Sequence, residues 1–187
     1  MKILILCYFA IAALLLKGAY NWLRAIFLRA SFIISLGKIC REKGFELKKL
    51  RNIFASLFCL SPKPDITVKT GDTEYLVRLI TCRARKRVYH FADHERFVRA
   101  MLLNLLLFTA QGEHLTLFRK LKYLPPLDEK YLTPDSRVVL LFNPSPLSVT
   151  FNESPSRREL GTDGADFNGW LIYSAAGFKK LLGGSSE

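Results

Sequence analysis

A chain of 187 residues, half of them hydrophobic, is long enough to bury the core of one ordinary domain and too apolar for a disordered protein. Its 28 Lys and Arg against 16 Asp and Glu give a formal net charge of +12, which favours an anionic partner, either nucleic acid or an acidic membrane surface. Residues 1–51 hold ten basic and two acidic residues, and this excess lies beside the most apolar stretch of the chain, which favours lipid.

Residues 1–19 predict a hydrophobic membrane anchor. Ile3 to Leu16 is an unbroken apolar run between Lys2 and Lys17. As a helix this run spans about 21 Å, less than the roughly 30 Å of a hydrocarbon core, and continuation through Leu23 would make it long enough to cross. No small-residue motif for signal-peptide cleavage follows the run, so the segment is expected to remain as an uncleaved anchor. Because most of the flanking Lys and Arg follow the run, the remainder of the chain is expected on the cytoplasmic side.

Residues 20–44 predict a basic amphipathic helix that ends at Gly44 in a C-cap. Apolar residues recur at helical spacing, with basic and hydroxyl side chains on the other side; the apolar set is Trp22, Leu23, Ile26, Phe27, Ala30, Ile33 and Ile34. Two interpretations are open. The helix lies in the membrane interface, or it packs its apolar stripe against a sheet as the first helix of a globular core.

Residues 45–187 predict one α/β domain with a mixed central sheet flanked by helices. Residues 74–82 are apolar on both faces, which is typical of a strand in the middle of a covered sheet, and Gly71 in T-G-D-T predicts a hairpin turn before it. The other expected strands are 45–47, 66–69, 138–142, 148–151, 157–160 and 170–173, with a strand or amphipathic turn at 115–124. Helices are expected at 93–108 and 178–182, and a Gly/Asp-rich rim loop at 161–169.

The order of elements over residues 20–142 resembles that of the restriction-endonuclease-like nucleases. In that family an acid at the start of the second strand and an acid-x-Lys pair in the next strand hold Mg²⁺ and activate water. Pro64-Asp65 matches the first acid, and Glu46 and Glu74 are the candidates for further carboxylates. Residues 77–83, V-R-L-I-T-C-R, contain no second acid. The resemblance therefore implies a similar fold without the nuclease chemistry, with Asp65 as a turn or cap residue.

The densest basic run follows the long strand and consists of Arg83, Arg85, Lys86 and Arg87. It is interpreted either as a site for the phosphates of lipid headgroups or nucleic acid, or as a solvated strand extension that prevents edge pairing. His90 and His94 are four residues apart, but His90 precedes the expected helix, so no metal site is predicted. The cysteines form no C-x-x-C pair and each lies in apolar surroundings, which predicts free, buried thiols in a reducing compartment.

These patterns together predict a non-catalytic, membrane-anchored domain that faces the cytoplasm, carries a basic surface for an anionic partner and uses no cofactor. The alternative is a divergent nuclease-like enzyme or nucleic-acid-binding protein that uses Asp65, the basic run and Mg²⁺. A shared cleft for Glu46, Asp65 and Glu74 would favour the alternative, whereas scattered carboxylates would favour the first prediction.

Overall fold

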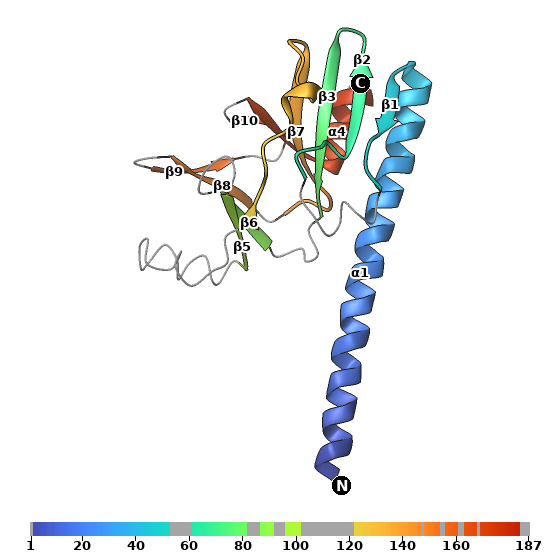
Figure 1. Ribbon diagram of the computed structural model, residues 1–187, viewed down its shortest axis with the longest axis vertical. Coiled ribbons are helices and arrows are strands. Elements are labelled where there is room, and N and C mark those ends of the chain that lie inside the picture. The colour runs from blue at the N-terminus through green and yellow to red at the C-terminus, as the bar shows by residue number, and fades with distance from the viewer. Residues whose placement is uncertain are drawn as a thin grey trace.

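The computed structural model describes residues 2–52, 61–81, 87–91, 96–101, 122–146, 148–153, 156–160, 163–167 and 169–183. It has a mixed α/β architecture, which confirms the fold class predicted from the sequence (Figure 1). The elements are α1 (Lys2–Lys43), β1 (Glu46–Lys49), β2 (Ile66–Thr70), β3 (Thr73–Ile80), β4 (Arg87–Phe91), β5 (Arg96–Met101), β6 (Lys122–Tyr123), the 3₁₀ helix η2 (Glu129–Tyr131), β7 (Ser136–Phe142), β8 (Ser148–Glu153), β9 (Ser156–Leu160), β10 (Asp163–Phe167), β11 (Trp170–Ser174) and α4 (Ala175–Gly183).

A six-stranded mixed sheet forms the centre of the body, with the strand order β1-β2-β3-β7-β11-β10. The neighbours β3, β7 and β11 are parallel, while β1, β2 and β10 join antiparallel at the two sides. The predicted hairpin is confirmed, because β2 pairs with β3 from Ile66↔Val77 to Thr70↔Thr73 and Gly71 turns with a φ of 57°. Side chains of β3 are buried on both faces, as expected for a central strand.

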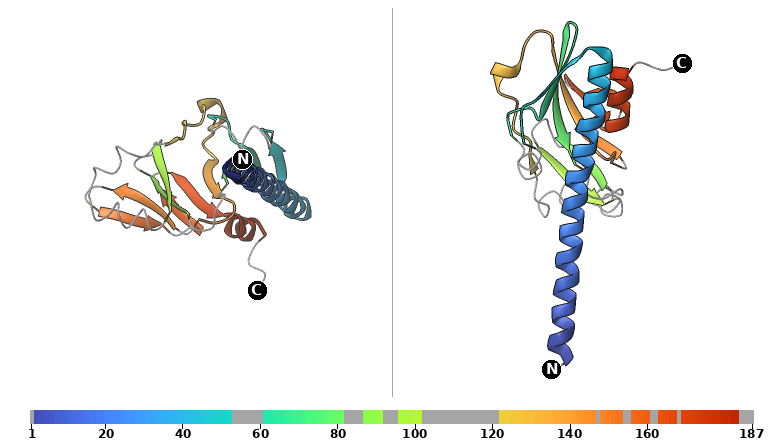
Figure 2. Two further views of the ribbon diagram at one scale, coloured as in Figure 1. Left: turned by 90° about the horizontal axis from the view of Figure 1, so that it is seen from below. Right: turned by 90° about the vertical axis from the view of Figure 1, so that its right-hand side faces the viewer.

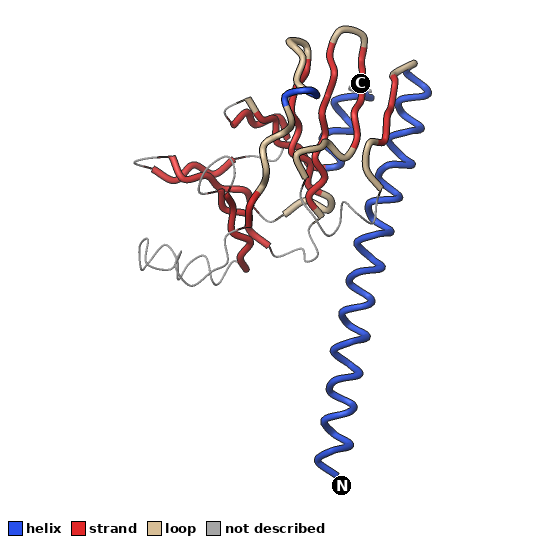
Figure 3. Tube along the Cα trace, in the orientation of Figure 1, coloured by secondary structure: helices blue, strands red, loops and turns tan. Residues whose placement is uncertain are grey.

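A second sheet has five strands in the order β6-β5-β4-β8-β9. It lies beside the first sheet, on the side away from α1 (Figures 1 and 3). Its parallel pair β4 and β8 follows the parallel pair β3 and β7 along the chain, so two neighbouring strands of the first sheet lead to two neighbouring strands of the second. Aromatic side chains fill the core between the sheets, and the rings of Tyr89 and Phe142 lie 5.0 Å apart. The expected strands 148–151 and 157–160 are present as β8 and β9, which pair antiparallel in this sheet.

Two predicted elements are wrong. Residues 96–101 of the expected helix 93–108 form strand β5, which pairs antiparallel with β4 and buries Phe97 against Phe91 with ring centroids 5.4 Å apart. The remaining residues of that expected helix, 93–95 and 102–108, lie outside the described part of the chain. In the expected rim loop, residues 163–167 form β10 on the edge beside β11. Gly164 with a φ of 88° lets this strand bend past Tyr173.

Helix α1 is a single helix of 42 residues that includes both N-terminal segments distinguished in the sequence. Its C-terminal half packs on the six-stranded sheet (Figure 2), and it ends at Gly44, whose φ is 71° and where the Phe45 amide donates 2.7 Å to the Cys40 carbonyl. This half belongs to the domain core, through a buried set consisting of Ala25, Arg29, Phe32, Leu36 and Cys40.

The buried face of α1 differs from the predicted apolar stripe. Leu23, Phe27 and Ile34 of that stripe are among the exposed large side chains. The reason is that this part of the helix is apolar on two sides, and the side that contacts the sheet includes Arg29, which bonds to β3. Hydrophobic periodicity alone cannot choose between two such sides.

The N-terminal half of α1 extends away from the body (Figures 1 and 2). Among the side chains described in this half, Tyr8, Ile11, Leu14, Leu15 and Leu16 are exposed. Within the described residues, none of the helices combines the length and the apolar character that a membrane span requires. At the other end of the chain, α4 buries Phe178 and Leu182 against the same face of the sheet that α1 covers.

Candidate functional site

The three candidate carboxylates lie at two different places on the sheet. Strand register pairs Lys69 of β2 with Glu46 of β1 on one side and with Glu74 of β3 on the other, at the hairpin end. Glu46 is exposed there and forms an ion pair of 2.9 Å with Lys48. Asp65 directly precedes the pair Ile66↔Val77 and is four residues from Lys69, which is about 13 Å along the strand. The structure therefore does not bring Asp65 together with either glutamate.

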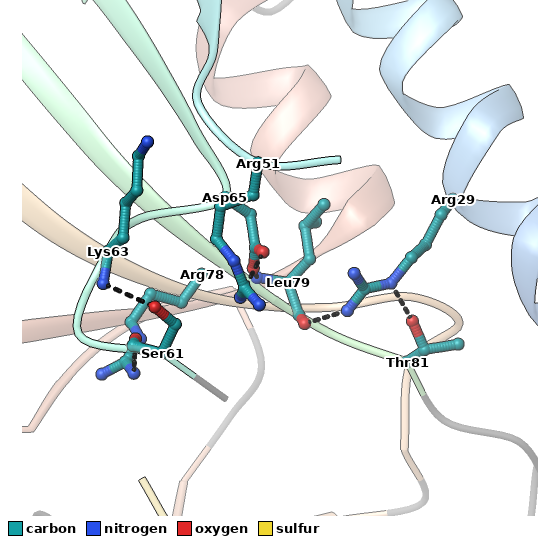
Figure 4. A network of polar contacts seen from close by, with 8 residues as sticks. All are labelled: Arg29, Arg51, Ser61, Lys63, Asp65, Arg78, Leu79 and Thr81. Atoms are coloured by element: carbon teal, nitrogen blue, oxygen red, sulfur yellow. Dashed lines mark hydrogen bonds and ion pairs between the residues drawn. The ribbon is translucent and has the colours of Figure 1, made fainter. Parts of the chain in front are cut away.

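Asp65 is buried, and both of its carboxylate oxygens accept hydrogen bonds (Figure 4). Oδ2 accepts 2.7 Å from the Leu79 amide, and Oδ1 accepts 3.0 Å from the Arg51 guanidinium. The backbone of Asp65 donates 2.9 Å to the Val77 carbonyl and accepts from the amides of Leu50 and Arg51. Asp65 thus joins the segment after β1 to the middle of β3.

Two buried arginines hold the C-terminal part of β3 from opposite faces. Arg29 reaches from α1 and donates to the Leu79 carbonyl and the Thr81 hydroxyl (Figure 4). Arg78 is a residue of β3 itself, and its side chain lies on the other face of the strand. It donates a hydrogen bond of 2.6 Å to the Pro125 carbonyl and one of 2.7 Å to the Ser61 carbonyl. The Arg78 guanidinium also lies 5.9 Å from the centre of the Trp170 ring, within cation–π range.

Burial decides the protonation energetics of these groups. Each arginine side chain is only 2% exposed, and desolvation lowers the pKa of both Arg29 and Arg78 to about 10. Both stay protonated at neutral pH. Burial raises the pKa of Asp65, while Arg29, the Leu79 amide, Arg51 and Arg78 oppose that shift. One carboxylate therefore faces three guanidinium groups, and its negative charge offsets part of theirs.

This arrangement is suited to holding strands in place. Arginine stays protonated and cannot act as a general base, and the Asp65 oxygens are engaged by a backbone amide and a guanidinium. Among the described residues, no group of three or more His, Cys, Asp or Glu is placed to hold a metal ion. Of the histidine pair considered in the sequence, His90 lies on β4 and His94 lies outside the described residues.

Sequence reasoning identified Asp65 but missed the roles of Arg29, Arg51 and Arg78. A usable signal existed for Arg78, because it is a single basic residue between Val77 and Leu79 in a strand that is apolar on both faces. A cation at such a position must find partners when it is buried. The partners of these arginines lie 14 to 52 residues away in the chain, which only the folded structure reveals.

The basic run is described only at its last residue. Arg87 begins β4 opposite Met101, whereas Arg83, Arg85 and Lys86 lie outside the described residues. Thr81, the last described residue before the run, is bonded to Arg29 in the middle of α1. The chain therefore enters the basic run from the end of β3 that lies towards the apolar half of the helix.

Cys7 and Cys40 are free thiols, as predicted, and Cys40 is buried as expected, whereas Cys7 is exposed on the half of α1 that extends from the body. Cys59 and Cys82 lie outside the described residues. Cys40 is buried in the core, and this burial raises the pKa of its thiol.

No protein-family model, curated protein or solved structure matches this chain.

Proposed function

We propose that this protein is a non-catalytic, membrane-attached domain. The N-terminal half of α1 embeds in the bilayer, and the α/β body faces the cytoplasm and presents a basic surface to an anionic partner. The observation that carries this proposal is the apolar half-helix that extends from the body, where the large side chains that the structure describes are exposed. Soluble monomers rarely expose a continuous apolar surface of this kind without a partner for it.

The energetics favour lipid as that partner. Transfer of a large aliphatic or aromatic side chain out of water contributes about 1.5–3 kcal/mol. Five exposed side chains of the half-helix would together contribute on the order of 10 kcal/mol; they are Tyr8, Ile11, Leu14, Leu15 and Leu16. Lys17 is the only charged residue between Ile3 and Leu23, and its long stem can carry the ammonium group to the interface.

The position of the basic run supports anionic lipid headgroups as the partner of the basic surface. The run follows Thr81, which is bonded to Arg29. Arg29 lies six residues beyond Leu23, about 9 Å along the helix, which is comparable to the screening length of salt in the cell. Thr81, from which the chain enters the basic run, therefore lies within the range at which an acidic leaflet attracts cations.

The contacts of Asp65 support the non-catalytic part of the proposal. A nuclease of the restriction-endonuclease-like type would use this carboxylate as a ligand for Mg²⁺. Here the carboxylate accepts from the Leu79 amide and from Arg51, and it lies apart from Glu46 and Glu74. We therefore propose a resemblance to that superfamily in fold alone, without its nuclease activity.

Glutamates in the half-helix should abolish membrane binding. We expect the full chain to float with lipid vesicles in a density gradient, and the double variant Leu15→Glu/Leu16→Glu to stay in the dense fraction, because two carboxylates cannot enter the hydrocarbon. The matched control is Leu132→Glu/Leu181→Glu, which places the same charges at exposed leucines of the body. Equal flotation of both double variants would refute the proposal.

Neutralising the basic run should weaken binding to acidic membranes selectively. Each Lys or Arg near an anionic surface contributes about 1 kcal/mol. The variant with glutamine at Arg83, Arg85, Lys86 and Arg87 should therefore lose affinity for phosphatidylserine-rich vesicles and keep its affinity for uncharged vesicles. The control is Lys48→Gln/Lys69→Gln, two cations at the hairpin end. A loss half as large in this control, in proportion to its two charges against four, would show that only net charge matters.

A further inference from the structure

Helix α1 carries a second apolar stripe that the body does not cover. Its residues alternate in spacing between three and four, the heptad pattern of a coiled-coil seam; they are Ala13, Leu16, Tyr20, Leu23, Phe27, Ala30 and Ile34. The large members are strongly exposed, from 60% at Leu23 to 73% at Ile34. The seam continues from the half-helix proposed to enter the membrane to the part that packs on the sheet.

The seam faces away from the body. Residues 25, 32 and 36 are buried against the sheet, while residues 23, 27 and 34 are exposed. An offset of two residues on a helix is a rotation of about 200°. The seam therefore lies on the opposite side of α1 from the sheet, and in heptad terms the body contacts the outer c and f positions.

We infer that this seam pairs two copies of the chain as a parallel coiled coil. Lipid cannot account for the whole stripe, because Ile34 lies 18 residues beyond Leu16, about 27 Å further along the helix and beside the body. A sustained spacing of 3.5 residues is what keeps one side of a helix against an identical helix. With the bodies on the outer c and f positions, two copies meet without contact between their sheets.

Charges beside the seam favour the parallel orientation. Lys17, Arg24 and Lys38 occupy e positions, whereas the g positions are Ala19, Ile26 and Ile33. In an antiparallel pair the e positions of the two helices face one another, so the cations would repel. In a parallel pair each e position faces a g position, and the aliphatic stems of the cations can lie over apolar side chains. Parallel pairing also places both N-terminal halves at the same membrane.

Disulfide trapping tests the pairing. In the full chain with Cys7, Cys59 and Cys82 replaced by serine, Leu16→Cys and Ile34→Cys should each form a disulfide-linked dimer on mild oxidation in native membranes. The matched control is Leu15→Cys, which is 69% exposed, adjacent to Leu16 and off the seam. We expect at least tenfold slower trapping of the control. Self-trapping at two sites 18 residues apart identifies a parallel pair, because an antiparallel pair brings identical residues together at its centre alone.

Each other result contradicts the inference. Trapping of Leu15→Cys as fast as Leu16→Cys means random collision. A disulfide-linked dimer of Leu16→Cys without one of Ile34→Cys would confine pairing to the apolar half-helix. No disulfide-linked dimer of either variant would mean that the seam does not bind a second copy of the chain.

A charge variant gives an independent reading in detergent solution. The measured protein mass in detergent should be that of two copies for the full chain and that of one copy for the Phe27→Glu variant. Because Phe27 is exposed in a single copy, this variant should keep the thermal melting curve of the body and should still float with vesicles. Failure of pairing is in this way distinguishable from failure of membrane attachment. A dimer that persists in the Phe27→Glu variant would contradict pairing through the seam.

Discussion

Replacement of Asp65 by alanine should lower the free energy of unfolding by about 3–5 kcal/mol, because it removes one partner of a buried ion pair. The change leaves the Leu79 amide without its acceptor and leaves Arg51 without its carboxylate. It also removes the negative charge that faces the buried cations Arg29 and Arg78. A loss of this size is a large share of the 5–15 kcal/mol that stabilises an ordinary domain.

Urea denaturation followed by far-ultraviolet circular dichroism measures this loss. Glu46→Ala and Glu74→Ala are the matched controls, and both should change stability by about 0.5 kcal/mol or less, because these carboxylates lie at the solvated hairpin end. Asp65→Asn should fall between the wild type and Asp65→Ala, since an amide oxygen can still accept from Leu79 but carries no charge. A stable Asp65→Ala protein would show that Asp65 is not a structural residue.

Much of the six-stranded sheet could be predicted because its signals are local. The apolar runs of β3, β7 and β11, the Gly71 turn between β2 and β3, and Gly44 after α1 each depend on neighbouring residues. The second sheet could not be predicted in the same way. Phe97, Val98 and Met101 fit a helix as well as a strand, and their assignment to β5 depends on pairing with β4 and on the aromatic core beneath.

The site shows the same division between local and distant information. Pro64-Asp65 stands out in the sequence, but the turn or cap role predicted for Asp65 differs from what the hydrogen bonds show, since its carboxylate bonds to Leu79 and Arg51, each 14 residues away. The cations around it come from a helix, a loop and a strand, so no spacing rule connects them. Helix α1 adds a further difficulty, since both of its sides are apolar and the side with Arg29 is the one that packs on the sheet.

Removal of residues 1–19 should release the protein from membranes. The contacts of α1 that are fully buried begin at Ala25, so the shortened chain keeps its contribution to the core. The lost segment contains the five large exposed side chains of the half-helix, and with them on the order of 10 kcal/mol of transfer free energy. The seam residues Leu23, Phe27 and Ile34 stay in the shortened chain, so self-association can be followed separately.

Subcellular fractionation of the full and shortened chains tests membrane attachment most directly. The full chain should pellet with membranes and resist extraction by salt and by alkaline carbonate, while the shortened chain should appear in the soluble fraction with the circular dichroism spectrum of a folded α/β domain. A shortened chain that is folded and still pellets with membranes would contradict attachment through the N-terminal half of α1. A full chain in the soluble fraction would contradict membrane attachment altogether.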